Sequence, residues 1–177
     1  VAIEVLSSAV DALGVGPDGA RDIARTLLSA SGIQGMVGGQ WLDLAAEGRD
    51  LIADELTEIH RRKTGALIEA ACVVGGRAAD APARVLDALA GYGRDIGLAF
   101  QVADDVLDAT ATTAQLGKTA GRDASLGKST YVSFLGVAGA RDEASRLAGR
   151  ALECLQAAGV DSPSLVSLAR YIVKRQS

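Results

Sequence analysis

Apolar residues return every three or four positions along most of the chain, a spacing that places them on one face of an α-helix. This spacing predicts helices over 1–13, 21–46, 51–75, 83–108, 129–137, 140–158 and 163–174. The sequence contains neither the alternation typical of a half-buried strand nor a repeat of fixed length. It therefore predicts an all-α protein in which 1–177 form a single domain.

Glycine, proline and polar residues separate the predicted helices. GVGPDG at 14–19 and RAADAP at 77–82 are typical of turns. The polar stretch 109–128 has no period, and an irregular segment of that length inside a domain is usually either functional or disordered. Ser162 followed by Pro163 is typical of a helix start, so the last helix is expected to begin there.

Four glycines fall inside the predicted helix 21–46, namely Gly32, Gly35, Gly38 and Gly39. Glycine in a helix interior is less stable than alanine by about 1 kcal/mol. We therefore expect these glycines to permit close packing or a close approach of two backbones. The hydrophobic residues make up 49% of the chain but aromatic residues only 3%, which also favours closely packed helices.

The net charge and the cysteine content argue against several classes of protein. A net charge of −4 argues against general nucleic-acid binding, which needs a basic surface. Two distant cysteines and a single histidine argue against a zinc site or a disulfide framework. No apolar run reaches the roughly 20 residues that span a bilayer, so we expect no membrane span and a cytoplasmic protein. The predicted first helix lacks a polar cap, and we expect the chain to continue upstream of Val1.

The most specific chemical feature is the cluster Asp104, Asp105 and Asp108 at the end of the longest predicted helix. Residues i and i+4 lie on one face, so Asp104 and Asp108 project together. Carboxylates at a helix C-terminus are repelled by the helix dipole and by one another. Mg²⁺ would relieve this repulsion, because it binds one or two carboxylates together with phosphate oxygens and water. The alternative is a solvated acidic helix end.

Three lysines that lie next to glycine or threonine are candidates for binding an anion. Lys118 and Lys128 each follow a glycine in the irregular segment, and Lys63 precedes Thr64 and Gly65. Glycine lets a backbone approach an anion, and an ammonium group supplies a mobile point charge. Ordinary surface lysines are the alternative. The GKS at 127–129 is not a P-loop, because its spacing is wrong and no strand precedes it.

Isolated polar residues interrupt two apolar helices. Gln40 and Asp43 are three positions apart, and Gln101 lies in the apolar run that precedes the aspartates. Each one alone is more often a satisfied buried polar group than a ligand contact. We interpret His60 as a surface histidine.

Taken in order, these motifs resemble the second half of the trans-type isoprenyl diphosphate synthases, the family of farnesyl and geranylgeranyl diphosphate synthases. The bacterial farnesyl type is the branch that they resemble most. The resemblance extends over nearly the whole chain. The matching motifs are GMVGGQ at 35–40 with Asp43, IHRRKTGAL at 59–67, GLAFQVADDVLD at 97–108, LGK at 116–118 and LGKSTY at 126–131.

The resemblance implies an all-α helical bundle of the isoprenoid synthase type, incomplete at the N-terminus, with Mg²⁺ as cofactor. It implies that Asp104, Asp105 and Asp108 hold the metal, with Asp104 as the main ligand. It also implies that 109–128 closes over the site. The residues expected to contact the substrate diphosphate are Lys63, Lys118, Lys128, Gln40 and Asp43. Those expected to act at the reaction centre are Lys63, Thr64, Gln101 and Lys118.

The implied reaction condenses isopentenyl diphosphate with an allylic diphosphate, most closely as in farnesyl diphosphate synthase or geranyltranstransferase. The first aspartate-rich motif and the isopentenyl diphosphate site of the family lie upstream of this region. We therefore expect these 177 residues to be inactive alone. The family also implies a homodimer. Two alternatives remain: a non-catalytic helical subunit of a prenyl synthase, and a terpene cyclase of the same fold.

Overall fold

The computed structural model describes residues 8, 10–12, 14–110 and 128–174. Among these residues there are helices and no strand, which confirms the all-α prediction. The helices are α2 (Pro17–Ser31), α3 (Met36–Ala45), α4 (Ala53–His60), the π-helical turn η1 (Arg61–Gly65), α5 (Ala66–Ala78), α6 (Ala83–Thr110), α9 (Tyr131–Ala157) and α10 (Pro163–Lys174).

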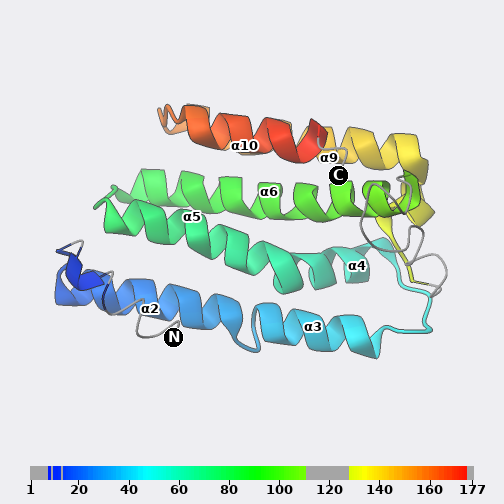
Figure 1. Ribbon diagram of the computed structural model, residues 1–177, viewed down its shortest axis with the longest axis horizontal. Helices are drawn as coiled ribbons and strands as arrows, with labels where there is room; N and C mark the ends of the chain where they lie inside the picture. Colours follow the sequence, from blue (N-terminus) through cyan, green and yellow to red (C-terminus); the bar gives the residue numbers. More distant parts are fainter. Residues whose placement is uncertain (1–7, 9, 13, 111–127, 175–177) are drawn as a thin grey trace.

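The helices form layers on either side of α6 (Figure 1). On one side lie α4, η1 and α5, which follow one another without a break, and beyond them α2 and α3. On the other side lie α9 and α10, which also contact each other. Because α6 packs against both sides, its end can meet side chains from elements far apart in the sequence.

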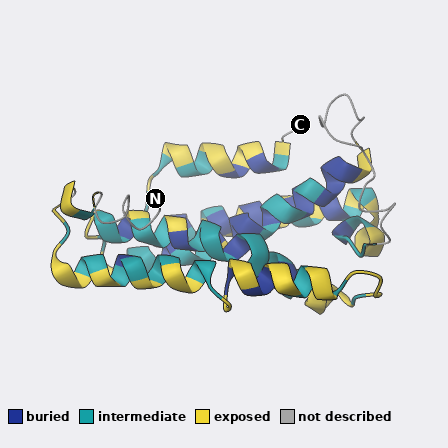
Figure 2. Ribbon diagram, turned by 60° about the horizontal axis from the view of Figure 1, so that its bottom comes forward, coloured by how far each residue is buried: buried dark blue, intermediate teal, exposed yellow. Residues whose placement is uncertain are grey.

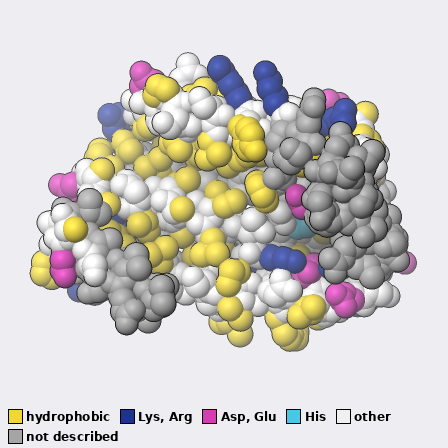
Figure 3. All heavy atoms as spheres, in the orientation of Figure 1, with side chains coloured by type: hydrophobic (Ala, Val, Ile, Leu, Met, Phe, Trp, Pro, Cys, Tyr) yellow, Lys and Arg dark blue, Asp and Glu magenta, His cyan; other side chains and the backbone are white. Residues whose placement is uncertain are grey.

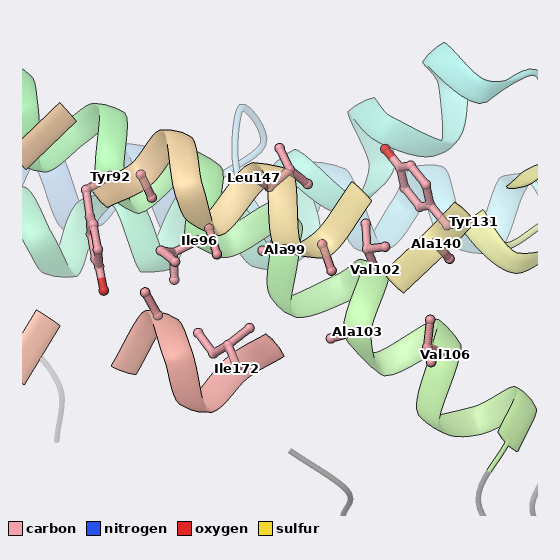
Figure 4. Close-up of a cluster of buried hydrophobic side chains, with 14 of the residues drawn as sticks. Tyr92, Ile96, Ala99, Val102, Ala103, Val106, Tyr131, Ala140, Leu147 and Ile172 are labelled. Atoms are coloured by element: carbon pink, nitrogen blue, oxygen red, sulfur yellow. The ribbon is translucent and has the colours of Figure 1, made fainter. Parts of the chain in front are cut away.

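The core lies along α6, which packs against helices on both of its sides. Tyr92, Ile96 and Val102 on α6 are almost completely buried, as is Leu147 on α9. They pack together with Ile172 of α10 (Figure 4). The Tyr92 hydroxyl donates a hydrogen bond of 2.7 Å to the Leu165 carbonyl, which fixes α10 on this core. Buried residues gather at the centre of the bundle and exposed residues on its outer faces (Figure 2).

The predicted helices 51–75, 83–108 and 163–174 are confirmed, three others differ, and most of the predicted helix 1–13 lies outside the described residues. The predicted helix 21–46 is wrong as a single element, because Gly32–Gly35 separate α2 from α3. Gly32 leaves the helix with φ −77° and ψ −161°. The two helices predicted at 129–137 and 140–158 are one helix, α9, with a kink at Gly136, where φ is 69°. Positive φ is readily adopted only by glycine, so the kink falls where the sequence permits it.

Glycines bring α3 and α6 against the backbone of η1 from two sides. A Cβ on Gly39 of α3 would lie 2.6 Å from the Lys63 Cα. A Cβ on Gly97 of α6 would lie 2.7 Å from the Gly65 Cα. These backbone atoms cannot move aside as a flexible side chain could. The expectation that glycines such as Gly39 permit a close backbone approach is confirmed.

We predict that Gly97→Ala lowers the free energy of unfolding by about 1–3 kcal/mol, because the added methyl group forces α6 away from η1. Chemical denaturation of the full-length protein measures this change. The matched control is Gly149→Ala in α9, where an added Cβ meets nothing within 4 Å. That change should stabilise the protein by up to about 1 kcal/mol. Equal effects at the two positions would contradict the packing described.

Candidate active site

A cavity of about 310 Å³ lies between α3, α4, η1, the end of α6 and residues 128–130. Basic, acidic and histidine side chains gather at this end of the molecule, whereas hydrophobic side chains cover much of the rest of the same face (Figure 3). The residues that line it are Asp43, Ala46, Glu47, Leu51, Leu56, Ile59, His60, Lys63, Gln101, Asp104, Asp105, Asp108, Lys128, Ser129 and Thr130. We call this the site cavity.

The last two turns of α6 present all three predicted aspartates to the site cavity. Asp104 is half-buried, whereas Asp105 and Asp108 are only 8% and 5% exposed. The Asp105 carboxylate accepts a hydrogen bond of 2.7 Å from the Tyr131 backbone N–H. Tyr131 is the first residue of α9, so the positive end of a second helix faces Asp105.

Two predicted lysines converge on one carboxylate in the site cavity. The Lys63 ammonium donates a 2.7 Å hydrogen bond to Asp43, and the Lys128 ammonium lies 3.4 Å from the same Asp43 oxygen. Burial alone would raise the pKa of Asp43, but the hydrogen bond from Lys63 and the charges of both lysines lower it below its usual value. Asp43 therefore stays ionised and holds both ammonium groups at the cavity wall.

The site cavity carries an excess of negative charge. Its described lining contains five carboxylates, from Asp43, Glu47 and the three α6 aspartates, and two ammonium groups. Within the described residues, no three His, Cys, Asp or Glu side chains lie close enough to hold a metal ion by themselves. A cation bound here would therefore need further ligands, such as phosphate oxygens and water.

The structure brings together most of the predicted site residues. Seven of them line the site cavity: Asp43, Lys63, Gln101, Asp104, Asp105, Asp108 and Lys128. Thr64 lies beside Lys63 in η1 but not among the lining residues, and Gln40 is exposed on α3. Lys118 and most of the segment 109–128 lie outside the described residues. The roles assigned to all of these residues stay predictions.

The expectation that His60 lies on the surface is wrong. Its side chain is 12% exposed, and its ring stacks on Tyr131 with the ring centroids 5.9 Å apart. Both ring nitrogens are buried, and neither has a hydrogen-bond partner within the described part of the chain. One signal could have indicated this position: His60 lies three residues before Lys63 and so shares its helix face.

The chain also matches known proteins over most of its length. The sequence profile of the polyprenyl synthetase family matches residues 6–160. The chain belongs to the polyprenyl synthetase family. It is 50% identical over 153 residues to farnesyl diphosphate synthase of Escherichia coli, a match that covers 84% of this chain and 51% of that protein.

Two further known proteins match over a similar length. Geranylgeranyl pyrophosphate synthase 6 of Arabidopsis thaliana is 42% identical, over 93% of this chain and 51% of that protein. A solved geranyltransferase from Helicobacter pylori, complexed with magnesium and isoprenyl diphosphate, superposes with a TM-score of 0.78 at 30% identity. That superposition covers 96% of this chain and 55% of the other.

The chain spans about half the length of the curated relatives it matches. No helix within the described residues is long and apolar enough to cross a bilayer. The homodimer and the cytoplasmic location stay predictions.

We predict that Lys63→Met raises the pKa of Asp43, because burial remains while the nearer ammonium is lost. In the unchanged protein the folded pKa lies below the unfolded value of about 3.9, so the Asp43 charge stabilises the fold above that pH. This contribution disappears as the pH falls through the folded pKa. As the pH falls from about 5 through the folded pKa of Asp43, the free energy of unfolding should therefore fall less in the variant.

NMR titration of the Asp43 carboxyl carbon in the full-length protein measures this pKa directly. Lys128→Met is the matched control, and its effect should be smaller because its ammonium lies farther from Asp43. An Asp43 pKa that Lys63→Met leaves in place would contradict the ion pair.

Proposed function

We propose that this chain handles the allylic diphosphate in a short-chain prenyltransferase, most closely a farnesyl diphosphate synthase or geranyltranstransferase. The observation that carries the proposal is the meeting of Lys63 and Lys128 with the α6 aspartates in one cavity. The other substrate is isopentenyl diphosphate. The relatives named as farnesyl and geranylgeranyl diphosphate synthases support this assignment.

The charge balance of the site cavity supports a need for magnesium. A diphosphate is itself strongly negative, and the carboxylates of the described lining outnumber the ammonium groups by three. Coulomb repulsion in a partly enclosed cavity would therefore oppose binding of the free anion. Divalent cations remove this conflict, because they bind carboxylate and phosphate oxygens together.

The side chains present fit Mg²⁺. Asp104 and Asp108 are separated by one helical turn and offer hard oxygen ligands on the same cavity wall. When bound there with the diphosphate, Mg²⁺ would neutralise charge on the leaving group. We propose Asp104 and Asp108 as the side chains that hold it.

The reaction begins when the allylic carbon–oxygen bond breaks and both bonding electrons leave with pyrophosphate. Negative charge grows on that leaving group, so ammonium groups already fixed beside it lower the barrier. Asp43 holds the ammonium groups of Lys63 and Lys128 in the cavity before the substrate arrives. Their positions therefore need little reorganisation when the bond breaks.

The remaining allylic cation must be protected from water until it reacts. Leu51, Leu56 and Ile59 supply apolar lining beside the charged groups. The amide of Gln101 lies one helical turn before Asp104 and lines the same cavity, so we propose it near the reacting carbons. The double bond of isopentenyl diphosphate then attacks the cation, and loss of one proton from the adduct restores a double bond.

We predict that Asp104→Ala in the full-length protein lowers prenyl transfer by about 100-fold or more while the fold stays intact. Incorporation of labelled isopentenyl diphosphate measures the rate, and chromatography of the dephosphorylated product identifies its length. Asp87→Ala is the matched control, since Asp87 is an exposed residue of the same helix.

Near-normal transfer by Asp104→Ala would remove Asp104 from the proposed machinery. A full-length protein that consumes an allylic diphosphate without incorporating isopentenyl diphosphate would instead be a cyclase. A protein without either activity that only supports a separate synthase would be a non-catalytic subunit.

A further inference from the structure

Asp105 has a partner that sets it apart from a simple metal ligand. Its carboxylate is buried and accepts a 2.7 Å hydrogen bond from the Tyr131 N–H. That N–H belongs to the first residue of α9, where backbone donors have no acceptor within their own helix. Asp105 therefore supplies an acceptor that the start of α9 needs, and it places a negative charge at the positive end of that helix.

The contact with α9 also offsets the repulsion between the Asp105 carboxylate and the C-terminal end of the α6 dipole. A buried carboxylate near a helix C-terminus is unfavourable unless a positive group faces it. For Asp105 the start of α9 is such a group, so the position of Asp105 is explained without a cation. Asp104 and Asp108 line the same cavity.

The start of α9 carries a residue of the site. Lys128 lies three positions before Tyr131, and residues 128–131, here called the α9 lead, are attached at several points. The Leu51 N–H donates a 3.1 Å hydrogen bond to the Ser129 hydroxyl. The Tyr131 hydroxyl lies 2.6 Å from the Thr57 hydroxyl. Asp105 attaches the lead to α6, through a charged side chain that accepts a hydrogen bond from the backbone.

The end of the α9 lead also forms an N-terminal cap for α9. The Thr130 hydroxyl accepts a 3.1 Å hydrogen bond from the Ser133 N–H, and the Ser133 hydroxyl accepts a 3.0 Å hydrogen bond from the Thr130 N–H. This reciprocal cap makes residues 130–133 rigid. Because Asp105 binds within that rigid unit, fixing Tyr131 also limits where the Lys128 ammonium can reach.

We propose that Asp105 is a positioning residue that acts through Lys128: it fixes the α9 lead on α6 and so holds the Lys128 ammonium in the site cavity. On this assignment the carboxylates that bind the cation are Asp104 and Asp108. The inference rests on the proposed function of the site, because it concerns how the diphosphate is bound.

The test compares Asp105→Asn with Asp105→Ala in the full-length protein, with inorganic pyrophosphate and Mg²⁺ as the probe. Asparagine keeps an oxygen that can accept from the Tyr131 N–H but lacks the charge that a metal ligand needs. Alanine removes both. We expect Asp105→Ala to weaken pyrophosphate binding about 10- to 100-fold and Asp105→Asn to recover most of that loss. At saturating pyrophosphate, the Mg²⁺ concentration at half-saturation should shift in neither variant.

Asp104→Asn and Asp104→Ala are the matched pair for a metal ligand. Both should weaken pyrophosphate binding alike and raise the Mg²⁺ concentration needed for half-saturation. If Asp105→Asn instead behaves like the Asp104 variants in both measurements, Asp105 is a metal ligand and the inference is overturned.

A double-mutant cycle tests whether Asp105 acts through Lys128. If it does, adding Asp105→Ala to Lys128→Ala should weaken pyrophosphate binding by less than about threefold further. Losses that multiply would overturn the inference. The control is the same cycle with Lys63, which lies in η1 and not in the α9 lead, and there the losses should multiply.

Two outcomes distinguish a failure of this inference from a failure of the proposed function. An unchanged protein that binds no pyrophosphate in the presence of Mg²⁺ contradicts the proposed function itself. Binding by the unchanged protein, together with independent effects of Asp105 and Lys128, contradicts only the inference. Should Asp105→Ala fail to fold, the comparison of Asp105→Asn with Asp104→Asn decides alone, because asparagine preserves the contact to α9.

Discussion

An excess of carboxylates in one partly enclosed cavity is the constraint on which the rest of the site depends. Like charges held together in such a cavity destabilise the fold unless each one meets a positive group. The structure shows how this requirement is met at two of these carboxylates. Asp43 has two ammonium groups beside it, and Asp105 faces the start of α9. For Asp104 and Asp108 we propose Mg²⁺ brought together with a diphosphate.

The scaffold must hold these groups close together although they come from distant parts of the sequence. Close packing of η1 between α3 and α6 does this, because Gly39 and Gly97 let the backbones approach on both sides. Lys63 lies inside η1, so its backbone is fixed by packing as well as by its ion pair. The charged groups are thus brought together by packing that two glycines allow.

The sequence predicted the longest helix well, because apolar spacing runs without interruption from Ala83 to its aspartates. It missed the break between α2 and α3, since the apolar spacing continues through Gly32–Gly35. The π-helical turn at Lys63 was also missed, because one additional residue in a turn scarcely alters a periodic pattern.

For the site, the residue types and their order predicted which side chains would meet. Seven of the described ones line the site cavity, whereas Thr64 and Gln40 do not. Their partners could not be predicted. The Asp105 carboxylate binds a backbone group 26 positions away, and Lys128 reaches a carboxylate 85 positions away. Such contacts follow from the packing of whole helices, which no local pattern contains. His60 was assigned to the surface for the same reason, since its stacking on Tyr131 depends on the place of α9.

We propose above all that the site cavity binds a diphosphate only together with a divalent cation. The most direct measurement is calorimetric titration of the full-length protein with inorganic pyrophosphate, with and without Mg²⁺. We predict binding in the presence of Mg²⁺ and none detectable in its absence. Pyrophosphate that binds equally well without any divalent cation would contradict the claim.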